Sequence, residues 1–194
     1  MENKISEYKD LLKGRLKEKR YYHSLCVADE AKRLAKKYGA NEDKAYLAGL
    51  LHDITKNDDK ETHFKIFNKY KYSLNEIEAS SQKLWHAMSG SIYVKEVLGI
   101  KDEEIISAIR YHTTAKSSMT LLQKILYLAD FTSLDRDYTD IDVMRILVDV
   151  SMEKAMKYAL SYTINELVGK GAAIHPDTIS AYNEIMLKEK SDDI

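Results

Sequence analysis

The stretch that decides the fold is LLHDITK, residues 50–56, in which an imidazole and a carboxylate follow an apolar run. Leu47 and Ala48 extend the run towards the N-terminus, so the pattern predicts an apolar helix whose polar end lies at the edge of a buried core. Ligating groups such as His52 and Asp53 can be held there without bulk water, which is where a metal site is expected. Two residues cannot complete a coordination sphere, so the pair predicts a metal site only if the rest of the chain supplies partners.

The size and charge of the chain narrow its class. A protein of 194 residues and 22.4 kDa suits one domain spanning residues 1–194 and buries a core without disulfides. Within it we expect a motif core over about 20–136 and C-terminal helices over about 140–188. Lys and Arg total 30 against 31 Asp and Glu, a net charge of -1. No global basic field attracts a nucleic acid polymer, so an anionic ligand must be met by local charge.

Cysteine usage and the N-terminus indicate the compartment. Cys26 is the single cysteine, which excludes an internal disulfide and fits a reduced cytosolic protein, with Cys26 as a core filler. The first residues lack the apolar core of a signal peptide, and no stretch is long enough to span a bilayer. We therefore expect a soluble, cytoplasmic protein with no membrane partner.

The scarcity of helix breakers predicts an all-α fold, a single-domain helical bundle of eight to ten helices. One proline and seven glycines occur in 194 residues, and strand-type alternation is absent from the pattern. Helices are expected over about 6–17, 21–38 and 62–72, with a break near 149–151 in the C-terminal run. Cap signals are expected at the following positions: Gly39 and Asn41, a capping box of Ser73 with Glu76, Asp102, and a capping box of Thr120 with Gln123.

Helical spacing sends further ligating groups towards the same core. Ile105, Ile109 and His112 fall at i, i+4 and i+7, and Leu126 and Asp130 are four apart. Each such residue alone is more often a hydrogen-bonded core residue or a cap. Four of the six histidines nevertheless take inward positions, with His63 and His175 left without a role. The candidate ligands are His23, His52, Asp53, His86, His112 and Asp130.

The order and context of these residues carry a resemblance to a known family. The relevant motifs are Arg20-Tyr-Tyr-His23-Ser24, His52-Asp53-Ile-Thr-Lys56, Leu84-Trp85-His86-Ala87, Arg110-Tyr-His112-Thr113-Thr114 and Leu128-Ala129-Asp130. The chain resembles the HD-domain metal-dependent phosphohydrolases, and within them the YqeK subfamily of symmetrical diadenosine tetraphosphate hydrolases. The resemblance runs from about Arg20 to Arg136 and more loosely to the C-terminus.

The resemblance implies a dinuclear centre. His23, His52, Asp53 and Asp130 would hold one ion, His86 and His112 a second, and Asp53 would bridge them. The HD pattern alone also occurs with one metal, but the presence of both His86 and His112 favours two. The family implies iron, and imidazole with carboxylate also accepts Mn, Co or Zn.

The resemblance also implies the reaction. A metal-bound hydroxide would attack the β-phosphorus of diadenosine tetraphosphate in line, and two ADP would result. Asp53 and Lys56 would be the catalytic residues. The candidate contacts to substrate phosphate are Lys56, Arg20, Thr113, Thr114 and Arg136.

Several alternatives stay open at this point. Lys56 and Arg20 also fit solvated side chains, Arg136 also fits an ion pair with Asp135 or Asp137, and Thr114 also fits a helix end. After Asp130 the family has Tyr-Ile-Glu-Pro, whereas this chain reads Phe-Thr-Ser-Leu, which leaves the conformation of this loop and the reach of Arg136 open.

Two further functions compete with the main prediction. The same centre suits hydrolysis of mononucleotides or other phosphoesters, and a non-catalytic nucleotide-sensing module would bind a nucleoside diphosphate without turnover. The family also implies a homodimer. The Tyr-rich helices fit its interface, and they fit the core equally well. Trp85 fits a core residue better than a platform for a base.

Overall fold

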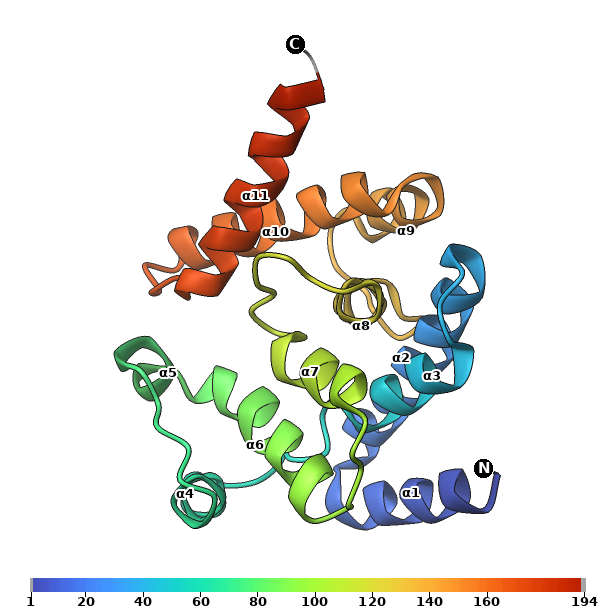
Figure 1. Ribbon diagram of the computed structural model, residues 1–194, viewed down its shortest axis with the longest axis vertical. Coiled ribbons are helices and arrows are strands. Elements are labelled where there is room, and N and C mark those ends of the chain that lie inside the picture. Colours follow the sequence, from blue (N-terminus) through green and yellow to red (C-terminus); the bar gives the residue numbers. More distant parts are fainter. Residues whose placement is uncertain (1, 193–194) are drawn as a thin grey trace.

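The computed structural model describes residues 2–192, which form eleven helices and no strand (Figure 1). The all-α prediction is confirmed, with one helix more than the ten expected at most. The helices are α1 Glu2–Arg15, α2 Glu18–Tyr38, α3 Glu42–Leu51, α4 Lys60–Lys69, α5 Glu76–Ser80, α6 Gln82–Glu96, α7 Glu103–Tyr111, α8 Leu121–Thr132, α9 Ile141–Val150, α10 Met152–Gly169 and α11 Pro176–Asp192.

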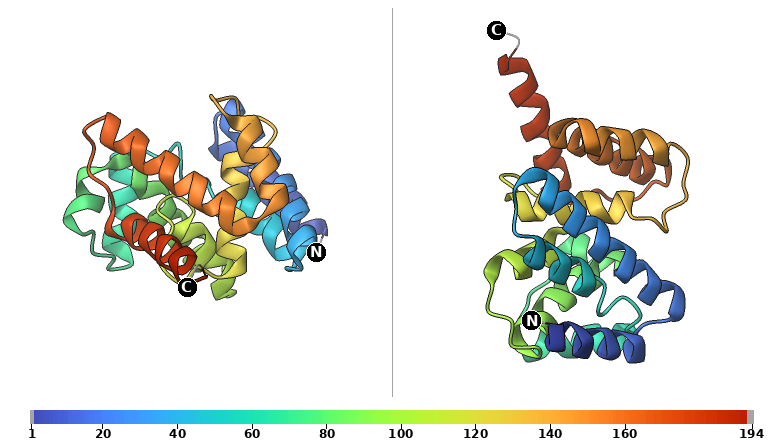
Figure 2. Two further views of the ribbon diagram at one scale, coloured as in Figure 1. Left: turned by 90° about the horizontal axis from the view of Figure 1, so that it is seen from above. Right: turned by 90° about the vertical axis from the view of Figure 1, so that its right-hand side faces the viewer.

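The core lies where α2, α3, α7 and α8 pack against one another, with α6 against α7. Figure 2 shows α9, α10 and α11 gathered on one side of this group and α1 on the other. Leu50, Leu51, Ile109, Leu126 and Leu128 have no exposed surface. The apolar faces that carry the HD pair, His112 and Asp130 therefore meet in one core, as their helical spacing predicts.

A glycine allows α2 and α3 to approach closely. A Cβ atom on Gly49 would lie 2.7 Å from the Cα of Ala28 and 2.9 Å from the carbonyl oxygen of Val27. Both neighbours belong to the backbone of α2, which moves only if the helix moves. The absence of a side chain at Gly49 thus sets the distance between the helix that carries His23 and the helix that leads to His52.

Most of the cap predictions are confirmed. Gly39 ends α2 in the left-handed conformation with φ 73°, and Asn41 and Asp102 accept hydrogen bonds from first-turn amides. Thr120 and Gln123 form the predicted capping box, and Ser151 separates α9 from α10 within the predicted break.

One cap prediction is wrong. The capping box that opens α5 joins Asn75 to Glu78, two residues after the predicted pair Ser73 and Glu76. The carboxylate of Glu78 is buried and pairs with Arg110 at 2.7 Å. Ser73 with Glu76 and Asn75 with Glu78 are equally good local patterns for a capping box. The helix begins at the second, because there Glu78 reaches both Arg110 and the amide of Asn75, so a tertiary contact decides the position.

None of the helices described here is both long and apolar enough to cross a bilayer. Cys26 is buried, in keeping with its predicted place in the core.

Candidate metal centre

The six predicted ligands come from five helices or their ends. His23 lies in α2, His86 in α6 and Asp130 in α8, while His52 ends α3, His112 ends α7, and Asp53 follows His52 in a tight turn. All six side chains converge on one point between these helices. The four histidines are buried, as is Asp53, and Asp130 is partly exposed.

One side of the cluster consists of His23, His52 and Asp130. The Nε2 atoms of His23 and His52 lie 2.9 Å and 4.0 Å from Oδ1 of Asp130. The rings of His23 and His52 meet edge to face with centroids 5.3 Å apart. One atom from each of the three residues lies within 4.8 Å of the other two, close enough to share an ion.

The other side is arranged around Asp53. Its Oδ1 atom lies 3.2 Å from Nε2 of His86 and 3.8 Å from Nε2 of His112, and these two nitrogens are 3.1 Å apart. Its Oδ2 atom lies 3.4 Å from Nε2 of His52. Asp53 therefore contacts histidines on both sides of the cluster, and His52, Asp53 and His112 form a second group with ligand spacing.

Hydrogen bonds at the far side of the rings orient three of the histidines. The Nδ1 atom of His52 lies 2.6 Å from the carbonyl oxygen of Gly49, and that of His112 lies 2.7 Å from the carbonyl oxygen of Ile109. A carbonyl only accepts, so both rings carry the proton on Nδ1 and direct the Nε2 lone pair into the cluster. Nδ1 of His23 lies 2.8 Å from a carboxylate oxygen of Asp135. This is the usual arrangement behind metal-binding histidines.

Two buried atoms test whether these residues suit a metal. Among the residues that the structure describes, Nε2 of His52 and Oδ1 of Asp53 are buried without any hydrogen-bond partner. A buried nitrogen lone pair and carboxylate oxygen without partners are costly in a protein interior. A cation between them satisfies both, so the donor set of imidazoles and carboxylates fits divalent metal ions.

The electrostatics keep the carboxylates charged and the inner imidazoles neutral. Burial alone would raise the pKa of Asp53, but the neighbouring His52 and Lys56 hold it well below its usual range. Burial would likewise raise the pKa of Asp130, and Arg136 and His23 lower it. Burial lowers the pKa of His86 well below its ordinary value, and burial with the nearby His52 lowers that of His112 to about 4. Ionised carboxylates and neutral imidazoles are the protonation states that ligate metals.

Three of the proposed phosphate contacts lie beside the cluster. The Nζ atom of Lys56 is 3.0 Å from Nε2 of His86 and 3.7 Å from Oδ1 of Asp53, and burial lowers the pKa of this lysine. Arg20 donates to Oδ2 of Asp53 at 2.7 Å, and the hydroxyl of Thr113 lies 3.3 Å from Nε2 of His86. The side chains of Lys56 and Arg20 thus contact the carboxylate of Asp53 and do not extend freely into solvent.

The other two candidates differ from each other. Arg136 pairs with the carboxylate of Asp130 and donates to its carbonyl oxygen at 2.5 Å, so this arginine does reach the centre. Thr114 does not: its hydroxyl is buried and donates to the carbonyl oxygen of Ala115. Ala115 takes the left-handed conformation with φ 56°, and Thr114 serves the turn after α7. Trp85 is a core residue, since it is buried and its indole N–H donates to the carbonyl oxygen of Glu78.

The sequence interpretation missed two residues that support the site. The sequence suggests Asp135 only as a partner for Arg136, whereas in the structure its carboxylate also accepts a hydrogen bond from Nδ1 of His23. Arg145 in α9 donates to the carbonyl oxygens of Thr132, Ser133 and Arg136, and so fixes the loop after Asp130 in place of the absent proline. An acidic residue close behind a ligand was a usable signal for Asp135, whereas nothing in the local sequence marks Arg145.

A cavity of about 370 Å³ opens directly onto the centre. Its walls combine cluster residues with Lys56, Thr113 and Arg136, and with the aromatic rings of Tyr138 and Tyr162. This volume lies within the range of small-molecule sites, roughly 300–1,000 Å³. Cationic groups at the metal end and aromatic groups further out suit a phosphorylated ligand with a flat ring system.

The HD domain family model matches residues 20–135, a range that includes all six clustered ligands. The chain belongs to the HD domain family. Among curated proteins, a "Bis(5'-nucleosyl)-tetraphosphatase, symmetrical" of Halalkalibacterium halodurans is 38% identical over 93% of this chain and 96% of its own length. A Bacillus subtilis protein of the same description is 34% identical over 89% of this chain and 92% of its own length. This HD domain protein is thus similar to these tetraphosphatases over nearly its whole length.

A solved structure extends the similarity to the fold. A Clostridium acetobutylicum protein, described as a "predicted HD superfamily hydrolase involved in NAD metabolism", superposes with a TM-score of 0.92 and 36% identity. The match covers 95% of this chain and 97% of the other. The C-terminal helices beyond residue 135 therefore belong to the same arrangement as the HD core.

Proposed function

We propose that this chain hydrolyses diadenosine tetraphosphate symmetrically to two ADP, as a bis(5'-nucleosyl)-tetraphosphatase and phosphoric anhydride hydrolase. One observation carries the proposal. A converging set of four histidines and two aspartates lies in a chain that is similar over nearly its whole length to symmetrical tetraphosphatases. Within this set, His52 Nε2 and Asp53 Oδ1 are buried without a hydrogen-bond partner among the residues that the structure describes. Residues 1–194 act in this proposal as one HD phosphohydrolase domain.

The residues proposed to hold two ions fall into two sets around Asp53. His23, His52, Asp53 and Asp130 would hold one ion, and His86 and His112 together with Asp53 would hold the other. Two metal ions lower the pKa of water and draw charge from phosphoryl oxygens when bound. We propose iron as the metal, with Mn, Co and Zn as the alternatives that the same donors accept. Elemental analysis of protein purified without chelator distinguishes them.

The chain's own groups meet the charge of the substrate. Lys56 lies beside Asp53 and His86, where its ammonium neutralises oxygens of the phosphate under attack. Arg136, which contacts Asp130, and Arg20, which contacts Asp53, bind neighbouring phosphates, with Thr113 as a hydroxyl donor. Water adds to the β-phosphorus, the bond to the central bridging oxygen breaks, and ADP departs. The second ADP is the nucleotide that received the water oxygen.

Product analysis tests the proposal. Protein purified anaerobically and incubated with diadenosine tetraphosphate is expected to yield ADP alone. ATP together with AMP would contradict symmetrical cleavage. No turnover after addition of Fe, Mn, Co or Zn would contradict the activity itself.

We further propose that the enzyme is cytoplasmic and assembles as a homodimer. Support for the second comes from α9, whose outer face exposes Val143, Ile146 and Val150 at helical spacing. Sedimentation of the wild type and of Ile146→Glu tests this point, because a charged side chain in an apolar interface lowers the dimer fraction.

A further inference from the structure

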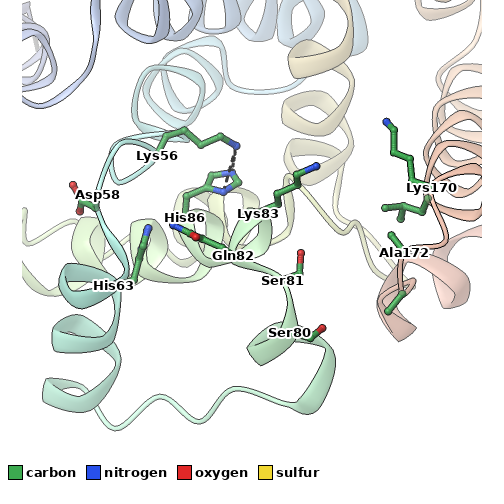
Figure 3. A pocket seen from close by; sticks show the side chains of 12 residues that line it. Lys56, Asp58, His63, Ser80, Ser81, Gln82, Lys83, His86, Lys170 and Ala172 are labelled. Atoms are coloured by element: carbon green, nitrogen blue, oxygen red, sulfur yellow. Dashed lines mark hydrogen bonds between the residues drawn. The ribbon is translucent and has the colours of Figure 1, made fainter.

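A second, larger cavity adjoins the metal centre from another direction. It has a volume of about 760 Å³ and is drawn in Figure 3. It shares Lys56 and His86 with the cavity that holds Tyr138 and Tyr162. The two cavities therefore meet at Lys56, which is proposed to contact the phosphate under attack, and at His86, which is proposed to bind a metal ion. We call them the aromatic cavity, lined by Tyr138 and Tyr162, and the lysine cavity, lined by Lys83 and Lys170.

The lysine cavity is built from segments far apart in sequence. Ser81, between α5 and α6, and Lys83, in the first turn of α6, form one wall. The end of α10 forms the opposite wall with Leu167 and Lys170. Figure 3 shows Lys83 and Lys170 extending from these two walls, with Lys56 above His86 at the metal end. Three amines thus surround a space large enough for a nucleotide.

The charge of this cavity is positive because its acidic group is already paired. Asp58 forms an ion pair with Arg15 at 2.8 Å. Lys170 pairs with Glu166 in its own helix, but Lys83 is exposed and makes no ion pair with any side chain that the structure describes. Ser81 begins the 15-residue helix α6 without a side-chain capping bond, so the positive end of the helix dipole adds to Lys83.

We infer that the two cavities bind the two nucleoside diphosphate halves of one substrate, and that Lys83 binds a phosphate of the half in the lysine cavity. The inference rests on the proposed function, since it needs a substrate with a nucleotide on either side of the scissile bond. Symmetrical cleavage leaves an ADP in each cavity. The halves are held differently: Tyr138 and Tyr162 flank one, whereas lysines surround the other.

Binding of ADP to the metal-loaded protein tests the inference without turnover. Calorimetry of the wild type is expected to give two ADP per chain in two steps. Lys83→Glu is expected to weaken one step roughly tenfold and leave the other, because it reverses a charge beside a phosphate. Tyr162→Ala is expected to weaken the other step. Lys83→Arg, which keeps the charge, is expected to retain both.

Lys36→Glu is the matched control, a charge reversal at an exposed lysine in the last turn of α2 that lines neither cavity. The KM for diadenosine tetraphosphate is expected to rise about tenfold in Lys83→Glu and not in Lys36→Glu, with the difference shrinking at high salt. Binding of only one ADP per chain by the wild type would overturn the inference. So would identical binding isotherms for Lys83→Glu and Lys36→Glu.

The two proposals fail separately. An inactive protein that binds two ADP would contradict the proposed function and leave the two half-sites intact. An active protein that binds one ADP would retain the function and contradict the half-sites.

Discussion

The two sides of the candidate metal centre use the same kinds of ligand but differ in how their histidine rings are held. On one side, Nδ1 of both His23 and His52 lies against an acceptor, from Asp135 and Gly49 respectively. On the other side only His112 is held in this way, by the carbonyl oxygen of Ile109. His86 has no such acceptor within residues 2–192. Its Nδ1 faces the ammonium of Lys56 at 3.4 Å, which is itself a donor.

The difference has a thermodynamic meaning. A ring that is already oriented loses little conformational freedom when it binds an ion, whereas a ring without an acceptor must be ordered by the ion itself. We therefore expect the ion on the side of His23 to bind more tightly than the ion on the side of His86. The following predictions either break this comparison or sharpen it.

Asp53→Asn has the largest expected effect. Asp53 contacts histidines of both sides, so its replacement removes the shared anion and both ions are lost. Elemental analysis is expected to give no bound metal, activity falls to background, and the helical CD signal persists. Retained turnover would contradict the site. His52→Ala is likewise expected to abolish activity while the helical CD signal persists.

His86→Ala is expected to remove one side only. Its side chain serves the less supported ion, so metal content drops from two ions per chain to one, and hydrolysis is lost. Titration with the metal followed by elemental analysis measures the ratio. Loss of both ions would mean that the two sides are not separable.

Asp135→Asn is expected to weaken metal binding on the side of His23. The variant keeps the size of the side chain but removes the charge that orients His23 through Nδ1. Metal affinity of the tighter site is expected to fall about 10- to 100-fold, with the second ion less affected. Competition with a chelator measures the affinities. Asp137→Asn, which changes an acidic residue two positions away, is the control.

Gly49→Ala tests the packing behind His23 and His52. The new methyl group would meet the backbone of Ala28 at 2.7 Å, so α2 and α3 must separate. We expect a loss of about 1–3 kcal/mol in the free energy of unfolding, measured by urea denaturation. Gly14→Ala in α1 has open space around it and is expected to stabilise the protein by about 0.5–1 kcal/mol. Equal effects of the two changes would contradict the close approach.

The acid stability of the metal-free protein gives the smallest effect. Burial would raise the pKa of Asp135, but the hydrogen bond from His23 lowers it from 3.8 to about 2. A carboxyl whose pKa is lowered by folding stabilises the folded state at any pH above its pKa in the unfolded chain. This contribution is lost as the pH falls from about 4 towards 2. Acid unfolding followed by CD is expected to be less steep in this window for Asp135→Asn. An unchanged profile would contradict the pairing.

The sequence predicted the candidate ligands better than it predicted the groups that orient them. Helical spacing and the family motifs were enough to propose that the six ligands converge, since each lies on an apolar face or at its end. The sequence did not predict the carbonyl acceptors of Gly49 and Ile109, because every residue has a carbonyl and only the fold selects these two. The role of Thr114 depends on the fold in the same way. Its hydroxyl has a backbone acceptor one residue away, and the left-handed Ala115 brings the two together.

The hydrogen bonds from Arg145 to the loop after Asp130 constrain the order in which the centre can form. All six candidate ligands have been synthesised once residue 130 has left the ribosome, and the family match ends at residue 135. The loop that carries Asp135 and Arg136 gains its hydrogen bonds from Arg145 only when α9 has folded and Arg145 has docked on its carbonyl oxygens. A nascent chain therefore has its ligands before it has their geometry, and we expect tight metal uptake to wait for the C-terminal helices.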